Sequence, residues 1–200
     1  MRQASGVGRR GIFISFEGIE GSGKTTQARL LAERLLKAGY KVVLTKEPGG
    51  TVIGNKIREV LLQPEHKEMF YLTELLLYNA DRAQHLKELI LPAIEEGHIV
   101  ITDRFTDSTI VYQGYGRGID MSLIRSLDEI VTGGIRPDLT ILFDLDAEAG
   151  LIRNKGANKI DRLELEDIEF HKKIREGYLK IAEAETERVK IVDASMQFEQ

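Results

Sequence analysis

Short, continuously apolar runs alternate along the chain with longer segments in which apolar positions recur every three to four residues. The longer segments are typical of helices. The short runs do not alternate with polar residues, which is typical of strands buried on both faces of a parallel sheet. The predicted strands are Ile12–Phe16, Val42–Thr45, His98–Asp103, Leu139–Leu145 and Val189–Asp193. The predicted helices are Thr25–Ala38, Gly54–Leu62, Met69–Glu96 with a break near Pro92, Met121–Thr132 and Asp167–Ala184.

This order of elements predicts an α/β fold. Right-handed crossovers between parallel strands place helices on both faces, so we expect three layers, α/β/α, around a five-stranded parallel sheet. Two irregular segments interrupt the pattern: the glycine-rich Tyr112–Asp120 and the basic Asn154–Arg162. No repeat or linker divides the chain, so residues 12–200 are expected to form one domain. Residues 1–11 are polar and include three arginines, which predicts a disordered extension.

Composition narrows the classes of function. The chain has 200 residues, no cysteine and a net charge of −4. The lack of cysteine excludes disulfides, thiolate metal sites and cysteine nucleophiles, and the negative charge argues against a nucleic-acid partner. The apolar run at Ile12–Phe16 is shorter than a signal-peptide core, and no run approaches the ~20 residues of a membrane span. We therefore expect a cytoplasmic protein with no membrane partner.

The segment between the first predicted strand and the first predicted helix matches the pattern G-x-x-x-x-G-K-[ST]. Glycines without Cβ let backbone N–H groups curl around a phosphate at a helix N-terminus. Lys24 would then reach the β- and γ-phosphates, and the Thr25 hydroxyl would bind Mg²⁺. The pattern predicts a P-loop NTPase. Its expected nucleotide-binding residues are Gly18, Ile19, Glu20, Gly21, Ser22, Gly23, Lys24, Thr25 and Thr26.

A second acidic position is expected near such a loop, on a neighbouring strand. The apolar run that begins at His98 ends in the carboxylate of Asp103. A carboxylate there can hold Mg²⁺ directly or through water. The sequence therefore predicts a metal site made by Thr25 and Asp103.

One tetrapeptide points to a different class. Asn158–Asp161 reads N-K-x-D, the guanine-reading signature of GTPases. In those proteins the tetrapeptide directly follows a buried strand, whereas the nearest predicted strand here ends at Leu145. The D-x-x-G expected after a strand is also missing. A GTPase switch is therefore disfavoured.

The basic segment around this tetrapeptide is better explained as a lid. Arg153, Lys155, Lys159 and Arg162 outnumber Asp161 between positions 153 and 162. A closing loop that carries arginine stabilises the negative charge of a phosphoryl-transfer transition state and excludes water. A solvated basic turn is the alternative if no phosphate site lies nearby.

Ordered motifs along the chain resemble those of the thymidylate kinase family, in the branch that has no arginine inside the phosphate loop. Together they extend from Ile12 to about Asp193. The resemblance rests on Phe16–Gln27, Glu47–Thr51, Asn79–His85, Asp103–Phe105 with Ser108, Tyr112–Gly114, Asp161–Glu164, and Phe170 with Arg175–Tyr178.

The resemblance implies the reaction ATP + dTMP → ADP + dTDP with Mg²⁺, in dTTP biosynthesis. It also implies a homodimer with a nucleoside-monophosphate-kinase-like fold and a lid at about residues 153–162. Arg104 would bridge the acceptor phosphate and the phosphate loop, Asp103 would serve the metal, and Glu20 would meet the 3′-hydroxyl or a metal-bound water. The implied catalytic residues are Lys24, Arg104, Arg153, Asp103 and Glu20.

The same resemblance implies a site for dTMP. Tyr78 would stack on thymine, and Arg82 would bond its carbonyl edge and help hold the phosphate. Thr109 would approach the pyrimidine, and Tyr112 would crowd the position of a ribose 2′-hydroxyl. Aromatic stacking and planar guanidinium groups suit these roles. The implied substrate residues are Glu20, Pro48, Arg58, Tyr78, Arg82, Arg104, Thr109 and Tyr112.

The lid departs from the family pattern. Lys155 and Lys159 stand where relatives often have arginine, and lysine lacks the bidentate geometry of a guanidinium. Arg153 is the first candidate for the transition-state cation, with Lys155, Lys159 and Arg162 as alternatives. Two other functions stay open at this stage: a different nucleoside or nucleotide kinase, and a partition-type ATPase, which would normally carry a second lysine near the start of the loop.

Overall fold

A computed structural model describes residues 11–155 and 161–196 of the chain. The predicted N-terminal extension, apart from Gly11, lies outside the described residues, as does the middle of the predicted lid. At the first described residue, the N–H of Gly11 donates to the carbonyl of Ile94 at 2.9 Å, which fixes the backbone just before the first strand.

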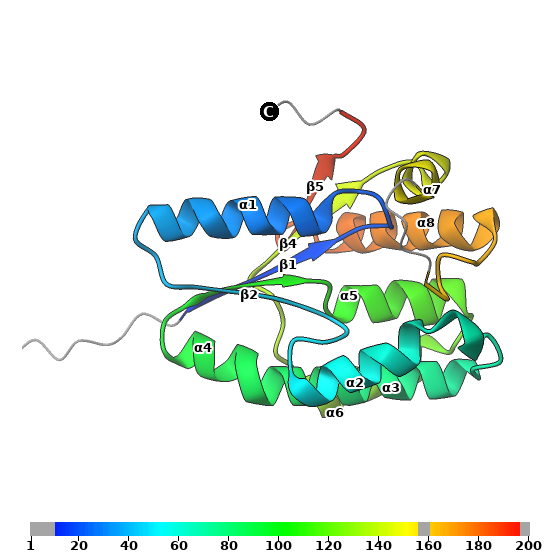
Figure 1. Ribbon diagram of the computed structural model, residues 1–200, viewed down its shortest axis with the longest axis horizontal. Helices are drawn as coiled ribbons and strands as arrows, with labels where there is room; N and C mark the ends of the chain where they lie inside the picture. Colours follow the sequence, from blue (N-terminus) through cyan, green and yellow to red (C-terminus); the bar gives the residue numbers. More distant parts are fainter. Residues whose placement is uncertain (1–10, 156–160, 197–200) are drawn as a thin grey trace, which may run out of the picture.

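All five predicted strands are present, and neighbouring strands are parallel throughout (Figure 1). Their order across the sheet is β2-β3-β1-β4-β5, so β1, which carries the phosphate-loop motif at its end, lies in the centre. The strands are β1 Ile12–Glu17, β2 Val42–Lys46, β3 Ile99–Asp103, β4 Leu139–Asp144 and β5 Val189–Asp193.

Eight α-helices are described. They are α1 Lys24–Lys37, α2 Val52–Leu62, α3 Tyr71–His85, α4 Leu91–Glu95, α5 Thr106–Thr109, α6 Met121–Thr132, α7 Ala147–Lys155 and α8 Ile168–Ala184. A 3₁₀ turn occupies Pro64–His66, and two π-helical segments occupy Leu86–Ile90 and Ile110–Gly116.

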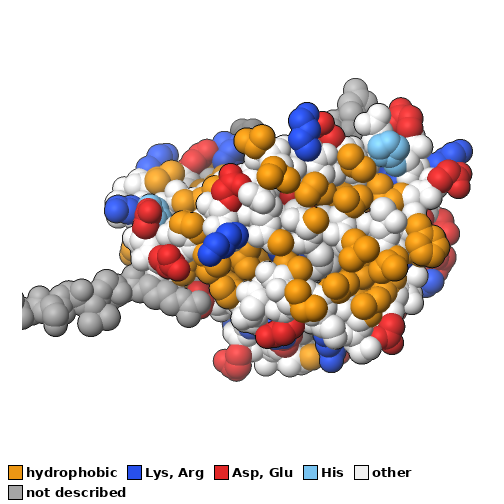
Figure 2. All heavy atoms as spheres, turned by 90° about the horizontal axis from the view of Figure 1, so that it is seen from below, with side chains coloured by type: hydrophobic (Ala, Val, Ile, Leu, Met, Phe, Trp, Pro, Cys, Tyr) orange, Lys and Arg blue, Asp and Glu red, His pale blue; other side chains and the backbone are white. Residues whose placement is uncertain are grey.

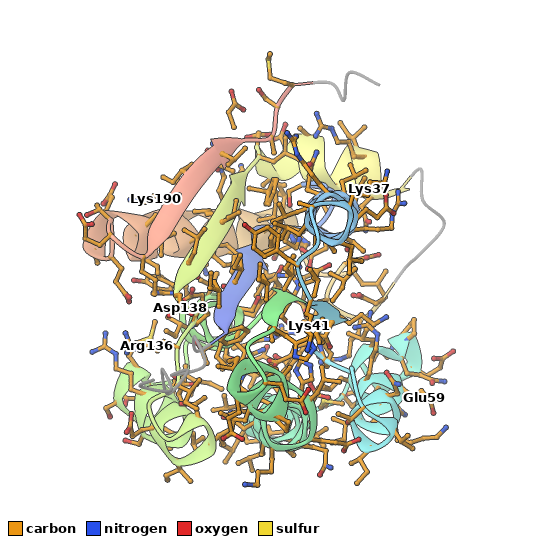
Figure 3. The ribbon with its side chains drawn as sticks, turned by 90° about the vertical axis from the view of Figure 1, so that its left-hand side faces the viewer. Lys37, Lys41, Glu59, Arg136, Asp138 and Lys190 are labelled. Carbon is orange, nitrogen blue, oxygen red and sulfur yellow. The ribbon has the colours of Figure 1, made fainter. Side chains whose placement is uncertain are left out.

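The three predicted layers are visible when the sheet is viewed along its strands (Figure 3). Helix α1 covers one face and packs on Ile14 and Phe16, whereas helices α3, α6 and α8 lie on the other face. Lys41 and Asp138, which precede β2 and β4, mark the amino ends of the strands (Figure 3). The carboxyl ends therefore meet at the opposite edge, where a ligand site is expected in an open α/β sheet.

Two helical predictions need correction. The expected break near Pro92 is absent from this described region, because the π-helical segment Leu86–Ile90 leads from α3 directly into α4 and Pro92 lies in the first turn of α4.

The segment Tyr112–Asp120 was predicted to be irregular, but it is helical as far as Gly116. Its glycines permit close packing: a Cβ on Gly114 would lie 2.5 Å from the Met121 side chain, and one on Gly116 would lie 2.6 Å from Phe170. Packing with α6 and α8 thus overrides the low helix propensity of glycine. Helix α7 was not among the predicted helical ranges, although the basic segment after it was expected to lie between two helices.

Candidate functional site

The phosphate loop is shaped by close contact with the backbone around it. Gly18 has a φ of 138°, and a Cβ there would lie 2.5 Å from the carbonyl oxygen of Phe143 at the end of β4. Gly21 has a φ of 72°, and its Cβ would lie 2.3 Å from the carbonyl oxygen of Gly150 in α7. Only glycine fits at these two positions, so the loop is held between β4 and α7. Its backbone N–H groups lie at the N-terminus of α1, where they can bind a phosphate.

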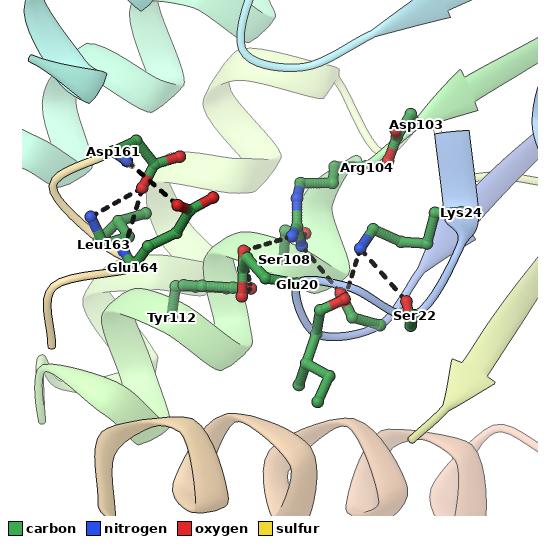
Figure 4. A network of polar contacts seen from close by, with 12 residues as sticks. Glu20, Ser22, Lys24, Asp103, Arg104, Ser108, Tyr112, Asp161, Leu163 and Glu164 are labelled. Carbon is green, nitrogen blue, oxygen red and sulfur yellow. Dashed lines mark hydrogen bonds and ion pairs between the residues drawn. The ribbon is translucent and has the colours of Figure 1, made fainter. Parts of the chain in front are cut away.

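Lys24 is buried within this loop at the first position of α1. Its Nζ donates to the carbonyl of Ile19 at 2.7 Å and lies 3.4 Å from Ser22 Oγ (Figure 4). Burial and the nearby Arg104 lower the pKa of Lys24 to about 8. The group is thus cationic at neutral pH but poorly solvated, which favours an anion such as a phosphate beside it.

The predicted metal ligands lie together. The Thr25 hydroxyl donates to Oδ2 of Asp103, and Oδ1 of Asp103 is buried without a hydrogen-bond partner among the described residues. Mg²⁺ is usually held by one or two protein oxygens together with phosphates and waters. The pair fits such an ion, and among the described residues no cluster of three or more His, Asp or Glu side chains could hold a metal alone.

Arg104 joins the loop to the cavity beside it (Figure 4). Its Nη2 lies 2.7 Å from Glu20 Oε1, and its Nη1 donates to the carbonyl of Gly18 at 3.1 Å and to the hydroxyl of Tyr178 at 3.1 Å. Its backbone φ is 77°, in the left-handed region that a non-glycine residue rarely adopts. This strained backbone at the end of β3 turns the guanidinium toward the loop.

Glu17 lies beneath Arg104 and is fully buried. Its carboxylate accepts from the N–H of Phe105 at 2.7 Å, the hydroxyl of Ser108 at 2.6 Å and the hydroxyl of Tyr178 at 2.8 Å. Burial, followed by the charge of Asp107, raises the pKa of Glu17 to about 7. The end of β1 therefore carries a carboxyl group that takes up a proton near neutral pH.

This raised pKa predicts how stability changes with pH. Folded protein keeps a proton on Glu17 between pH 4.5 and about 7 that the unfolded chain releases, so the free energy of unfolding should fall as pH rises through this range. Glu17→Gln should remove about 2 kcal/mol of that fall. Urea unfolding at pH 5, 6, 7 and 8 measures it.

The residual fall should persist in this variant because the pKa of Asp81 is raised to about 7 and that of Asp128 to about 6, both chiefly by burial. If Glu17→Gln and the unaltered protein have parallel profiles from pH 5 to 8, Glu17 does not titrate in this range.

The acceptor cavity, as we name the hollow in front of Lys24 and Arg104, has a volume of about 560 Å³. All of the residues that the resemblance assigns to dTMP line it, although they come from the loop, α2, α3, α5 and the segments between them. They are Glu20, Pro48, Arg58, Tyr78, Arg82, Arg104, Thr109 and Tyr112, and Lys24, Thr25 and Asp103 line the same cavity.

Arg82 is fixed at the base of this cavity. Its Nε donates to Glu47 at 2.8 Å, Nη1 to Thr109 at 2.8 Å and Nη2 to the carbonyl of Phe105 at 3.0 Å. Opposite, Tyr112 donates to Glu20 at 2.7 Å, so the sugar-side tyrosine and the loop carboxylate form one unit (Figure 4). Arg58 Nη1 donates to the carbonyl of Pro48 at 2.8 Å.

The donor cavity, as we name a second hollow of about 1050 Å³, lies between the loop, α1 and the ends of β4 and β5. Gly21, Ser22, Gly23 and Thr26 line it. Arg153 also lines it, and its guanidinium donates to the carbonyls of Ala194 at 2.7 Å and Ser195 at 2.9 Å. In this structure Arg153 is therefore on the donor side of the loop and away from Arg104.

The other lid candidates lie elsewhere. Arg162 is buried beside Glu74, and the side chain of Lys155 and the whole of Lys159 are outside the described residues. None of the predicted lid cations that the structure describes lines the acceptor cavity.

Two groups at the acceptor cavity were missed by the sequence reasoning. Gln113 lines the cavity and donates to Glu74 at 2.8 Å. His85 lies behind the cavity lining, where its Nδ1 is 2.9 Å from Oε1 of Glu47 and thereby supports the carboxylate that fixes Arg82. Both residues belong to motifs that resemble the thymidylate kinase family, and those motifs could have identified them. Because Tyr112–Asp120 was expected to be a loop, the contact of Gln113 with α3 was not predicted.

Comparison with known proteins adds a family to this geometry. A family model described as thymidylate kinase matches residues 16–200. The chain is 50% identical over 188 residues to a thymidylate kinase of Caldanaerobacter subterraneus subsp. tengcongensis, covering 94% of this chain and 89% of that protein. It is 48% identical over 191 residues to that of Geotalea uraniireducens, covering 92% and 90%.

A solved structure is similar over almost the same length. The crystal structure of thymidylate kinase from Ehrlichia chaffeensis aligns with a TM-score of 0.77 at 37% identity and covers 95% of this chain and 91% of that one. Within residues 11–155 and 161–196, no helix is long and apolar enough to cross a membrane.

Proposed function

Because this chain belongs to the thymidylate kinase family, we propose that the residues lining its two cavities bind ATP, Mg²⁺ and dTMP for phosphoryl transfer. The chain is a nucleoside monophosphate kinase, and its reaction transfers the γ-phosphoryl group of ATP to dTMP to give ADP and dTDP. What we propose is which residues of the chain take part in that reaction, whether the enzyme is a dimer and where in the cell it works.

The donor half of the site is assigned to the phosphate loop, from Gly18 to Thr26, with Lys24 on the β- and γ-phosphates. Mg²⁺, when bound by Thr25 and Asp103, would neutralise charge that develops on these phosphates. Arg153 faces the donor cavity, so it can act on the transferred phosphoryl group only if it leaves the carbonyls of Ala194 and Ser195.

The acceptor half is assigned to the cavity lined by Arg82, Arg58 and Arg104. In-line transfer needs the acceptor phosphate to be positioned, and the phosphate of dTMP is already anionic near neutral pH, its second pKa being about 6. A general base is therefore unnecessary. Glu20, held by Arg104 and Tyr112, would meet the sugar 3′-hydroxyl or a metal-bound water, and Tyr78 would stack on the base.

One observation carries this assignment. Eight residues from separate motifs line one cavity of about 560 Å³, and the same cavity reaches Lys24, Thr25 and Asp103. A nucleotide base and sugar can occupy it with the acceptor phosphate directed to the loop. A nucleotide-hydrolysing switch would have no use for such a second cavity.

The homodimer is likewise a proposal. Large hydrophobic side chains gather on the face formed by α2, α3 and α6 (Figure 2). An exposed apolar patch of this kind is typical of a protein–protein interface. The exposed members are Val52, Ile53, Val60, Tyr71, Leu72, Leu76, Leu123 and Ile130.

A cytoplasmic setting is proposed as well. It is supported by the position of the apolar run that follows the basic N-terminal residues. That run is β1, the central strand of the sheet, with Phe13 and Phe16 buried in the core. It is therefore part of the folded enzyme rather than a signal core.

The proposed function predicts a distinct acceptor preference. ADP release from ATP and Mg²⁺ should be stimulated by dTMP well above dUMP, dCMP and AMP, and GTP should not bind far more tightly than ATP. A coupled assay with this panel of acceptors and with free nucleosides measures it. If ADP release is the same with every acceptor and without any acceptor, the proposal is wrong.

A further inference from the structure

Arg162 follows the predicted lid, but its side chain is buried against α2 and α3. Its Nη2 lies 2.6 Å from Glu74 Oε2, and its Nε donates to the carbonyl of Leu61 at 3.1 Å. Its backbone N–H donates to the carbonyl of Leu62 at 3.1 Å. With only 4% of its side chain exposed, Arg162 anchors the chain around it and is not free to reach a phosphate.

Glu74, its partner on α3, is fully buried and receives donors from two further positions. Gln113 Nε2 donates to Oε1 at 2.8 Å, and Arg117 donates to both carboxylate oxygens at 3.3 and 3.2 Å. A buried carboxylate is costly unless it is paired and hydrogen-bonded. This one thereby joins α3 to the helical segment ending at Gly116 and to the segment around Arg162.

All three joined segments form walls of the acceptor cavity. Gln113 lines it directly, and Tyr78 lines it one helical turn after Glu74 on α3. Asp161, Leu163 and Glu164, on either side of Arg162, line the cavity too, on the side away from Asp103 and Lys24 (Figure 4). In the described parts of the chain, Glu74 and its partners contribute nothing to the lining of the donor cavity.

We propose that Glu74 is a positioning residue for dTMP, which holds Gln113 and the Arg162 anchor so that three walls of the acceptor cavity keep their spacing. The inference rests on the proposed function and deepens it. A carboxylate only accepts hydrogen bonds, so Gln113 must present its NH₂ group to Glu74, and the orientation of its amide is fixed. The guanidinium of Arg117 donates to both carboxylate oxygens, and the guanidinium of Arg162 forms an ion pair with Oε2.

Glu74→Gln tests this role with a side chain of the same size. The new amide brings one NH₂ group against guanidinium donors, so at least one partner must move. We expect the KM for dTMP to rise about tenfold or more, since small displacements around a bound substrate have effects of this size. The KM for ATP should stay within twofold. Initial rates with each substrate varied at saturation of the other measure both.

A matched control separates positioning from general loss of charge. Glu166→Gln also removes a carboxylate from Arg117, which lies 2.6 Å away, but Glu166 is partly exposed and, in the part of the chain that the structure describes, forms no ion pair with Arg162 and no hydrogen bond with Gln113. Its KM for dTMP should stay near that of the unaltered enzyme. A folded Glu74→Gln enzyme with an unchanged KM for dTMP, or equal rises in both KM values, would overturn the inference.

Arg162→Met keeps the test decisive if Glu74→Gln fails to fold. It removes the ion pair that anchors the segment around position 162, while Glu74 keeps its hydrogen bonds from Gln113 and Arg117. Thermal unfolding should then show a smaller rise in Tm on adding dTMP and an unchanged rise on adding ADP. If dTMP stabilises this variant as strongly as the unaltered protein, the inference fails. If dTMP neither stabilises nor is phosphorylated by the unaltered protein, the proposed function itself fails.

Discussion

Replacing Lys24 with alanine should lower kcat by about a thousandfold or more, because the proposed contact of its buried ammonium group with the β- and γ-phosphates would be lost. The other cations near the loop do not take its place in the described structure: Arg104 is held by Glu20, and Arg153 by backbone carbonyls. A coupled assay of ADP release with saturating ATP, Mg²⁺ and dTMP measures the effect.

The loss should come without unfolding. Burial lowers the pKa of Lys24 to about 8, which means that folding disfavours its charged form. Removing the ammonium group therefore relieves a desolvation cost while leaving a small void, and Tm should change little. Lys37→Ala is the control, since Lys37 ends the same helix, is exposed and lies at the far edge of the molecule (Figure 3). Turnover near that of the unaltered enzyme in Lys24→Ala would contradict the mechanism.

The strands could be predicted because their signal is local. Ile12–Phe16 and Leu139–Leu145 are apolar without alternation, and the structure buries their counterparts β1 and β4 inside the sheet. The phosphate loop followed from spacing alone, since Gly18 and Gly21 sit where backbone must approach backbone closely, and Gly23 has a positive φ of 90° that favours glycine. The assembly of one cavity from distant motifs followed only from the family resemblance, and the roles of those residues stay predictions.

What could not be predicted depends on contacts between segments far apart in the chain. Arg162 looked like a free lid cation, because nothing local shows that Glu74, far earlier in the sequence, lies beside it. Arg153 was placed in the same lid, but helix α7 turns it toward Ala194. Glycine-rich Tyr112–Gly116 looked like a loop, because its helix is stabilised by packing on Phe170 rather than by its own propensity.

Replacing Arg104 should have the second large effect, and the choice of substitute separates charge from geometry. Arg104→Met removes both, and kcat/KM for dTMP should fall by about a thousandfold, as is usual when a charged donor is lost from a transition-state site. Arg104→Lys keeps the charge but not the planar fork, which in this structure contacts Gly18, Glu20 and Tyr178 at once. We expect a loss of about a hundredfold for lysine.

The lysine variant is informative because it removes only some of the contacts that Arg104 makes. Tyr112 would still donate to Glu20, so the loop carboxylate keeps one of its partners, whereas the guanidinium contact with the carbonyl of Gly18 is lost. If Arg104 acts by joining the acceptor phosphate to the loop, Arg104→Lys should lower kcat with dTMP while basal ATP hydrolysis without acceptor stays unchanged. Full activity in Arg104→Lys would mean that charge is sufficient, and that the left-handed backbone at position 104 serves packing rather than catalysis.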